Sequence, residues 1–481
     1  MRVLVEPAAT AHTPESLARA LGRGRGVVLL RSGRFDTGGA GFSFVAADPL
    51  AVFEARGSAC GYRVGGVRRE WFGNPWRLLE SLAARFELPD EADFPFPLGG
   101  CFGFWGYDLR HHVEPRLARR ATDDLELPDC VVGLHDALVV FDHSADRVWI
   151  VSTGLRPDGT RDARHARQRA SAWRALLEAA PSPEDGRPDG EGGEAASATG
   201  REGFIRSVER ALGYIRHGHI YQVNLAQRLG AAWTGGGLEL FRRLAEVSPA
   251  PFSAYLDAGS FELASSSPEM FLRLSGAHVT TRPIKGTRPR DADPTRDAQL
   301  ACELQTSPKE LAELVMITDL LRNDLGRVCG YGSVQVPELV RLERFAQVQH
   351  LVSTIEGRLR PEVTHLAALA SAFPGGSITG APKIRAMDII DELEPVTRGP
   401  YTGCAGYLGF NRESQLNILI RTAVVRDGRA WFHTGAGIVA DSDPVAEYDE
   451  TLAKAGGFLA ALAAGRPVRR RAPSPARSAA R

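Results

Sequence analysis

Short apolar runs separated by glycine and polar turns characterise the chain from residue 1 to about 180. The runs at 26–30, 42–45 and 147–151 have the length and residue types of β-strands. Helical patterns are few here, and 76–86 is the clearest of them. We therefore expect residues 1–180 to form an N-terminal subdomain rich in antiparallel sheet.

The pattern changes after residue 180. Residues 181–200 contain Pro, Gly, Glu, Asp, Ser and Ala with almost no large apolar side chain, which is typical of a flexible linker or a long surface loop. Apolar residues near helical spacing then predict an amphipathic helix over 204–217. The segment 201–465 alternates helical and strand patterns and holds most of the candidate chemistry, whereas 466–481 reads as a disordered basic tail.

Composition narrows the protein class. The chain has 481 residues, of which 43% are hydrophobic and 24% charged, and its formal net charge is zero. These values are typical of globular proteins and favour neither nucleic acid nor an anionic membrane as a partner. The six cysteines lack C-x-x-C spacing, which disfavours a zinc or thioredoxin-like site. Without a signal-like N-terminus or an apolar run of about 18 residues, a cytoplasmic protein without a membrane span is expected.

Lys285, in the segment 282–288 (RPIKGTR), is the first candidate for covalent chemistry. A lysine has an ordinary pKa of about 10.4, so it is a nucleophile near neutrality only when it is desolvated or placed beside another cation. Pro283 restricts the backbone before it, and Gly286 allows another group to approach the chain closely. A solvated lysine in a turn is the alternative.

Two predicted helices offer paired carboxylates. Ser307 and Pro308 are typical of a helix start, and Glu310 and Glu313 then share one face of that helix. Near the C-terminus, Glu447, Glu450 and Lys454 share a face of another. Such carboxylates are suited to Mg²⁺, although the spacing alone favours ordinary first-turn acids and an i,i+4 salt bridge.

Two glycine-containing segments resemble anion-binding loops. Residues 373–383 (FPGGSITGAPK) precede a predicted helix beginning at 384, but Ala381 and Pro382 stand where a phosphate loop needs Lys and then Ser or Thr. A nucleotide-hydrolysing function is therefore rejected, although the loop could still present N–H groups to a carboxylate. The segment 434–437 (TGAG) predicts either a backbone nest or a tight strand connection.

Three isolated side chains are further candidates. Arg421 follows an apolar run and is either a charge at a sheet edge or a bidentate carboxylate clamp. His350 lies in a predicted strand, where a structural role is the more frequent one. Glu269 follows three serines and a proline and could serve as a general acid if desolvated.

Taken in order, these segments resemble the chorismate-utilising enzyme family. The resemblance covers 201–460 and is weaker over 42–49 and 99–108. The matching motifs lie at 221–225, 266–269, 283–287, 319–325, 348–354, 373–383, 435–438 and 447–454. The resemblance implies a composite α/β (α+β) fold, in which two packed antiparallel β-sheets carry helices on their outer faces. Both halves of the chain are then expected to join in one body with a central active-site cleft.

Two positions indicate an activity within this family. Anthranilate synthases usually carry alanine where this chain has Lys285, whereas lysine is typical of the branch that converts chorismate to 4-amino-4-deoxychorismate for p-aminobenzoate and folate. Salicylate and isochorismate synthases usually have lysine where this chain has Gln222. The resemblance thus implies amination of chorismate. Anthranilate synthesis, an aminase of a specialised pathway and a non-catalytic chorismate-binding protein remain as alternatives.

The resemblance also implies roles for individual residues. Lys285 would attack ring C2 while Glu269 protonates the leaving C4 hydroxyl, with His350 nearby, and ammonia would then attack C4 and expel the lysine. Mg²⁺ would be held by Glu313 and Glu450, with Glu310 and Glu447 as supporting or alternate ligands. Substrate contacts would come from Gln222, Gly286, Thr287, Tyr401, Arg421, Gly435, Ala436, Gly437 and Lys454.

A partner and a second ligand are implied in the same way. The family usually takes ammonia from a separate glutamine amidotransferase subunit, so a heterodimer is expected. The family's N-terminal region often holds a tryptophan pocket, which would lie near Ser43. Whether this chain binds tryptophan is left open by the sequence.

Overall fold

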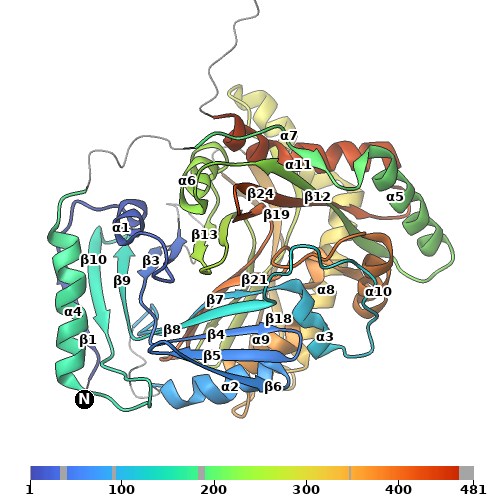
Figure 1. The fold of residues 1–481 in the computed structure, drawn as a ribbon. Helices are drawn as coiled ribbons and strands as arrows, with labels where there is room; N and C mark the ends of the chain where they lie inside the picture. Colours follow the sequence, from blue (N-terminus) through green and yellow to red (C-terminus); the bar gives the residue numbers. More distant parts are fainter. Residues whose placement is uncertain are drawn as a thin grey trace, which may run out of the picture.

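Two antiparallel sheets form the frame of the molecule (Figure 1). The computed structural model describes residues 2–32, 41–88, 91, 94–181, 190–345 and 348–464. Within them, each sheet has twelve strands. In strand order, the first sheet consists of β1 (Leu4–Ala8), β10 (Arg147–Ser152), β9 (Ala137–Asp142), β3 (Phe42–Ala46), β2 (Val28–Arg31), β13 (Phe252–Asp257), β14 (Glu262–Ser267), β23 (Thr422–Arg426), β24 (Arg429–Ile438), β12 (Gln222–Ala232) and β11 (Ala196–Ser197), with β20 (Gly380–Ala381) paired to β12. The second consists of β17 (Ile284–Pro289), β19 (Val348–Arg358), β16 (His278–Arg282), β15 (Met270–Ser275), β22 (Glu413–Ile418), β21 (Cys404–Gly409), β7 (Gly100–Trp105), β8 (Cys130–His135), β4 (Ala51–Arg56), β5 (Ala59–Val64) and β6 (Val67–Phe72), with β18 (Gln335–Arg344) paired to β19.

Both halves of the chain contribute to both sheets. In the first sheet β2 pairs with β13, and in the second β7 pairs with β21. Strand β7 also pairs with β8, and there it needs glycine, because a Cβ at Gly103 would lie 2.1 Å from the carbonyl oxygen of Val131 on β8. The predicted fold of two packed sheets shared by both halves is confirmed.

Helices cover the outer faces of the sheets. Buried side chains of α1 (Pro14–Leu21), α4 (Ala163–Glu178), α6 (Gly237–Val247) and α11 (Pro444–Ala463) pack on the first sheet. Those of α2 (Pro75–Ala83), α8 (Pro308–Gly326) and α9 (His365–Ala372) pack on the second, and α7 (Pro294–Thr306) lies along its β17 end. The remaining helices are α3 (Arg110–Val113), α5 (Gly200–Arg216) and α10 (Lys383–Leu393).

The core between the sheets is aromatic. Phe44 and Leu263 from the first sheet meet Phe104 and Tyr407 from the second, and the rings of Phe44 and Tyr407 lie 5.1 Å apart, edge to face. Such pairs add about 0.5–1.5 kcal/mol beyond their buried area. The predicted strands at 26–30, 42–45 and 147–151 and helices at 76–86 and 204–217 are confirmed to within a few residues.

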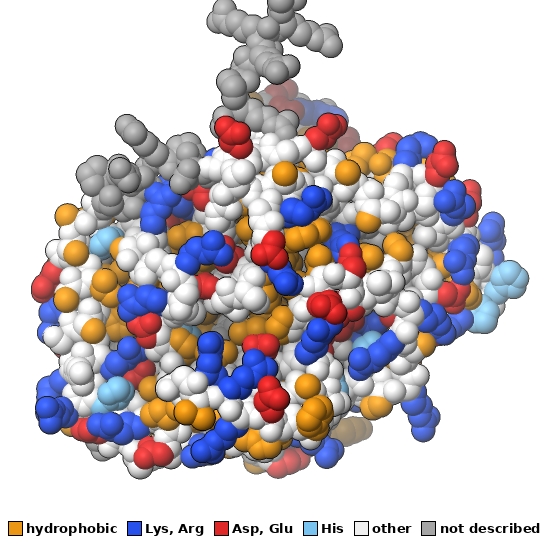
Figure 2. Space-filling view, viewed as in Figure 1, with side chains coloured by type: hydrophobic (Ala, Val, Ile, Leu, Met, Phe, Trp, Pro, Cys, Tyr) orange, Lys and Arg blue, Asp and Glu red, His pale blue; other side chains and the backbone are white. Residues whose placement is uncertain are grey.

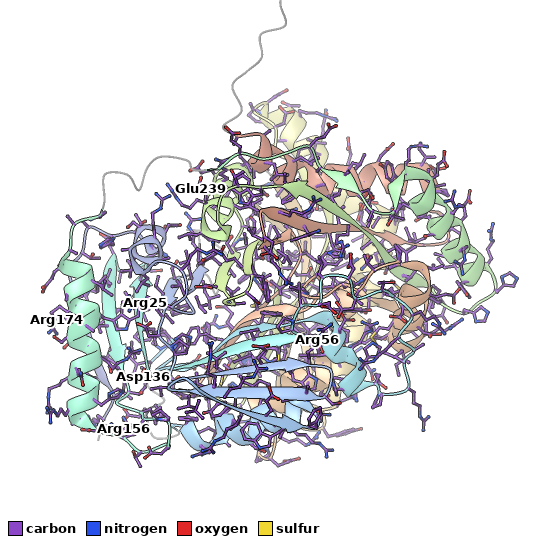
Figure 3. The ribbon with its side chains drawn as sticks, in the orientation of Figure 1. Arg25, Arg56, Asp136, Arg156, Arg174 and Glu239 are labelled. Atoms are coloured by element: carbon purple, nitrogen blue, oxygen red, sulfur yellow. The ribbon has the colours of Figure 1, made fainter. Side chains whose placement is uncertain are left out.

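Charged side chains fasten α4 to the first sheet. Figure 3 labels Asp136, which is fully buried, and Arg174. Arg169 of α4 pairs with Asp136 at 3.1 Å, and Arg174 pairs with Glu6 of β1. The helix is thereby held along β1, β10 and β9.

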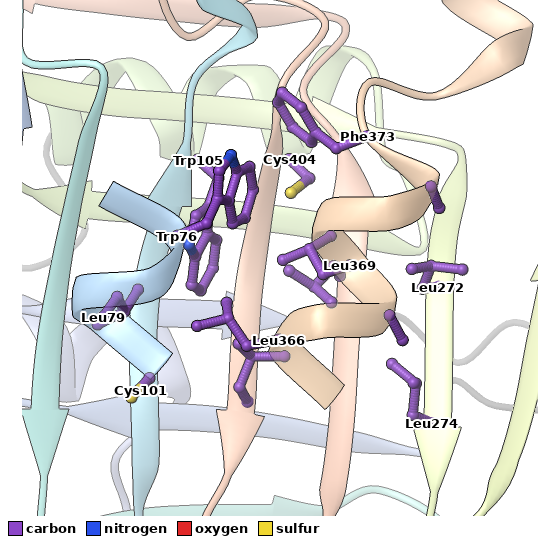
Figure 4. Close-up of a cluster of buried hydrophobic side chains, with 14 of the residues drawn as sticks. Trp76, Leu79, Cys101, Trp105, Leu272, Leu274, Leu366, Leu369, Phe373 and Cys404 are labelled. Atoms are coloured by element: carbon purple, nitrogen blue, oxygen red, sulfur yellow. The ribbon is translucent and has the colours of Figure 1, made fainter. Parts of the chain in front are cut away.

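A second core anchors the loop that follows α9. Trp76 of α2 and Phe373 pack edge to face with ring centres 5.2 Å apart, and Leu366 and Leu369 of α9 lie beside them (Figure 4). Phe373 is the first residue of the loop 373–383 and is 2% exposed. The loop therefore starts from a fixed point in the core.

Some expectations concern residues outside the described ranges. This applies to 182–189 of the expected linker and to all of the expected tail, 466–481. By contrast, 190–200 includes β11 and the start of α5. All six cysteines are free thiols, and only Cys302 is exposed. Across the described helices, none is both long and apolar enough to span a membrane.

Candidate active site

Lys285 lies on β17, at the end of the second sheet, with its amine turned into the protein. A bulge follows it, because the pairing of β17 with β19 shifts between Lys285 and Thr287, and Gly286 takes a φ of +67° there. The side chain is 13% exposed, and its Nζ lies 3.8 Å from Glu313 and 3.5 Å from the carbonyl oxygen of Ser377. Burial lowers the pKa of Lys285, while the charge of Glu313 opposes this shift.

Glu269, just before β15, is 6% exposed. The Ser377 hydroxyl donates to Glu269 Oε1 at 2.6 Å. Burial raises the pKa of Glu269 from 4.5 to about 7, against the opposing effects of this hydrogen bond and of Lys285. A carboxyl with that pKa exchanges protons near neutrality, as a general acid must.

His350 is a neutral imidazole near physiological pH. It is 3% exposed, and burial lowers its pKa to about 4. Its Nδ1 lies 2.8 Å from the hydroxyl of Thr287 and 3.3 Å from the carbonyl oxygen of Gly286. The Thr287 hydroxyl can donate to or accept from this nitrogen. Because His350 is already deprotonated to the neutral imidazole near pH 7, the acid that fits neutral pH is Glu269.

Arg421 provides positive charge between β22 and β23. Its φ is +50°, a conformation that a non-glycine residue adopts only when its surroundings hold it there. Burial lowers the pKa of this guanidinium, and no carboxylate of the described residues contributes to the shift. A desolvated guanidinium without a protein partner is suited to a bidentate anionic ligand.

The predicted nest or tight connection at 434–437 is wrong, because these residues belong to β24 and pair with β12. They still present backbone groups to the site. Lys454 donates to the carbonyl oxygen of Gly435 at 3.1 Å, so this peptide group faces away from β12. In an antiparallel strand Gly437 then faces the same way, since directions alternate along the chain. A Cβ at Gly435 would lie 3.1 Å from the Tyr401 hydroxyl, which places that side chain at the same edge, and the intervening Ala436 is fully buried.

Gln222, at the start of β12, is fully buried, and neither amide atom has a hydrogen-bond partner within the described structure. A Cβ at Gly437 would lie 2.6 Å from its Nε2. An unpaired buried amide is costly, so Gln222 is prepared to bind a polar group of a ligand.

The four predicted carboxylates lie on α8 and α11, which meet where Lys309 approaches Glu447 at 4.0 Å. Ser307 caps α8, as predicted. Burial raises the pKa of Glu313, and the charges of Glu310 and Glu450 add to this effect. Glu447 behaves likewise: burial raises its pKa, and Glu450 contributes.

These four carboxylates fit a hard divalent cation, because such a cation prefers oxygen ligands and its charge would offset the negative charges of the carboxylates. The i,i+4 pair expected from the spacing is also present, with Lys454 at 2.7 Å from Glu450. In the described part of the chain, no group of three or more His, Cys, Asp or Glu is already gathered closely enough to hold a metal by itself.

Ser43 lies apart from these residues, on β3. Its hydroxyl contacts His143 Nε2 at 2.6 Å and accepts from the amide of Ser32 at 3.0 Å. The adjacent cavity is lined by Phe42 and Phe44 and measures about 40 Å³.

A larger hollow was not predicted from the sequence. Basic and acidic side chains are interspersed over the face in Figure 2, with hydrophobic ones at its hollowed centre. A cavity of about 350 Å³ is lined by Arg56, which Figure 3 labels, and by His111, Asp129, Trp431 and His433. The ring of His433 stacks on Tyr401 at 5.1 Å, so this cavity lies behind the candidate site.

Three residues near Glu269 and Lys285 were not predicted from the sequence. Ser377 contacts both of them, and Asn224 and Arg398 donate hydrogen bonds to the backbone at Ser377 and Ile378. The loop 373–383 was recognised as an N–H donor, but the hydroxyl and carbonyl of Ser377 are what reach Glu269 and Lys285. A serine inside a glycine-containing loop was the only signal available.

Comparison with known protein families gives a match over most of the chain. Residues 33–460 match the family described as chorismate binding enzyme. The chain belongs to the chorismate-binding enzyme family. Among solved structures, anthranilate synthase component I from Streptococcus pneumoniae is similar with a TM-score of 0.76 and 31% identity, over 87% of this chain and 92% of that one.

The similar proteins within the chorismate-binding family include two different kinds of enzyme by name. Aminodeoxychorismate synthase component 1 from Bacillus subtilis is 37% identical over 90% of this chain and 91% of its own length. Anthranilate synthase component 1 from Synechocystis sp. is 40% identical over 88% of each. Overall sequence identity therefore does not distinguish between the two activities. The distinction has to come from the residues of the site.

Proposed function

We propose that this protein aminates chorismate to 4-amino-4-deoxychorismate, with ammonia from a glutamine amidotransferase partner. The main support is the placement of Lys285 and Glu269 around Ser377, whose carbonyl oxygen lies 3.5 Å from the Lys285 amine and whose hydroxyl donates to Glu269 Oε1 at 2.6 Å. Burial lowers the pKa of the amine and raises that of the carboxyl. An uncharged amine can act as a nucleophile and an uncharged carboxyl as an acid, so two such groups in one site are suited to react with the same substrate. Lysine rather than alanine at position 285 favours amination over anthranilate formation.

In the first step, neutral Lys285 attacks ring C2. The electron pairs of the ring shift, and the bond from C4 to its hydroxyl breaks while Glu269 donates its proton. Water leaves, and the Lys285 nitrogen loses a proton as the covalent adduct forms. Hydroxide is a poor leaving group, so this proton is needed for the step.

In the second step, ammonia attacks C4, the electron pairs shift back, and the Lys285 nitrogen takes up a proton as it leaves as an amine. The proton that the new C4 nitrogen loses supplies this one, and the proton that Lys285 released in the first step restores Glu269. Arg421, Tyr401 and the peptide groups at Gly435 and Gly437 hold the enolpyruvyl carboxylate, while Thr287 and Lys454 complete the anion pocket.

Glu313 and Glu450 would hold Mg²⁺, with Glu310 and Glu447 in support. When bound, Mg²⁺ would neutralise the ring carboxylate of chorismate and draw electrons from the ring. The support for such a site is that two glutamates on each of the two helices α8 and α11 lie where these helices approach each other.

A product assay tests the proposal. The protein is incubated with chorismate, Mg²⁺ and ammonium salt, and then with glutamine and a candidate glutaminase. An aminated product that keeps its enolpyruvyl group is expected. Fluorescent anthranilate with release of pyruvate would instead identify the runner-up function, which the anthranilate synthase relatives favour. Binding of chorismate without turnover would contradict both.

A further inference from the structure

Ser377 lies between the two groups that the proposed reaction requires. Its hydroxyl donates to Glu269 Oε1 at 2.6 Å, and its carbonyl oxygen lies 3.5 Å from Lys285 Nζ. The residue belongs to a short 3₁₀ turn, Gly376–Ile378, and is 6% exposed. One residue thus contacts both the acid and the nucleophile.

Two polar side chains hold Ser377 in this place. The Asn224 side-chain amide donates to the Ser377 carbonyl oxygen at 2.8 Å. Arg398, 2% exposed, donates to the carbonyl oxygen of the next residue, Ile378, at 3.1 Å. The backbone around Ser377 is therefore bound from two sides.

The start of the loop is fixed as well. The Lys383 amine donates to the carbonyl oxygens of Ala372 at 3.1 Å and Pro374 at 3.0 Å, and it pairs with Asp324 of α8 at 2.6 Å. The same helix carries Glu313 near its start. The serine and the candidate metal ligand consequently share one rigid support.

The donor direction at Ser377 determines where the acid proton lies. A serine hydroxyl has one hydrogen, and here it is directed at Oε1. In the protonated carboxyl, the acid hydrogen is then left to Oε2, which has no hydrogen-bond partner among the described residues. After proton transfer, the hydrogen bond at Oε1 becomes charge-assisted and stabilises the carboxylate that forms.

We propose that Ser377 is a positioning residue that keeps the acid proton of Glu269 on Oε2 and holds the Lys285 amine beside it. The inference rests on the proposed function, because it assigns Ser377 to the step in which the C4 hydroxyl leaves. Ser377 acts through its two neighbours and need not touch the substrate. Lys285 is the charged group that faces Glu269, so the pH dependence of the step has to be considered for this pair.

The test compares Ser377→Ala with Ser377→Thr, which keeps the hydroxyl. Ser414→Ala is the matched control, because Ser414 is 1% exposed and its hydroxyl contacts a titratable side chain, His365, at 2.8 Å outside the site. The full-length protein is mixed with chorismate and Mg²⁺ without ammonia. The rate of C4 hydroxyl loss and the mass of the Lys285 adduct are followed from pH 5.5 to 9, together with the melting temperature.

Ser377→Ala is expected to slow hydroxyl loss about tenfold to hundredfold, because a hydrogen bond to a forming charge is lost. The limb of its rate profile that follows Glu269 should move to higher pH, since the pKa of Glu269 rises once the donor is removed. Ser377→Thr should restore rate and profile, and Ser414→Ala should change neither. Should the alanine variant not fold, Ser377→Gly removes the same hydroxyl.

A lowered rate with an unmoved limb would show a merely structural role and overturn the inference, as would an undiminished rate in Ser377→Ala. These outcomes leave the proposed function intact if the wild type aminates chorismate. A wild type that forms neither adduct nor aminated product overturns the proposed function itself, and this inference with it.

Discussion

The pH dependence of hydroxyl loss is the sharpest consequence of the site. Glu269 must be protonated to act, and burial raises its pKa from 4.5 to about 7. At pH 8 about one carboxyl in ten is then protonated, against about one in 3,000 with the ordinary value. The difference corresponds to about 3 kcal/mol in favour of the protonated form. The active form of this group is present below pH 7 and is lost as the pH rises through that value.

Lys285 titrates in the opposite sense. It must be neutral to attack, and burial lowers its pKa, so its active fraction increases with pH. The rate of the first step should therefore follow a bell-shaped profile that contains the titrations of both groups. Since the two groups interact, both limbs describe the pair.

Glu269→Gln tests the role of Glu269 as the acid, separately from its size and its hydrogen bond with Ser377. Glutamine is nearly the same size and still accepts from Ser377 through its carbonyl oxygen, but it has no proton to transfer. The rate should fall about 10²- to 10⁴-fold, the usual contribution of a general acid. The falling limb should disappear with it.

The assay is a single turnover with chorismate and Mg²⁺ in the absence of ammonia, so that the ionisation of ammonia does not enter. Chorismate consumption is measured by chromatography and the Lys285 adduct by intact mass at each pH. A wild-type rate that keeps rising from pH 7 to 9 would refute the assignment of Glu269 as the acid. The same follows if Glu269→Gln keeps more than about a tenth of the activity.

Three further substitutions test other parts of the site. Lys285→Ala should abolish or redirect amination, as measured by product chromatography, and unchanged product and kinetics would rule out the covalent step. Arg421→Gln should raise the KM for chorismate about 10- to 100-fold, because a hydrogen bond from a charged group contributes about 1.5–3 kcal/mol. Arg426→Gln at the far end of the adjoining strand β23, where Arg426 pairs with Asp427 at 3.0 Å, should leave the KM unchanged, and equal effects of both would contradict the carboxylate clamp. Glu450→Gln should lose activity together with its dependence on Mg²⁺ in a titration, and full activity would show that the metal is placed wrongly.

Local sequence determined the elements that carry the chemistry. Ser307 and Pro308 set the start of α8 and hence the position of Glu310 and Glu313, because a cap and a proline act within one turn. Alternating apolar runs determined several strands for a similarly local reason. Prediction failed where the local pattern was ambiguous. The glycines of 434–437 are compatible with a nest as well as with a strand. They form a strand because they pair with β12, some 200 residues earlier in the chain.

The reactivity of the site was decided by the tertiary structure. Ser377 lies 108 residues from Glu269 and 92 from Lys285, and the contact among them forms only when a loop anchored in one core meets the edge of a sheet. The sequence named a lysine and a glutamate as candidates, but it did not determine their pKa values. Those depend on how much water the surrounding chain removes, and desolvation is a property of the packed molecule rather than of any segment.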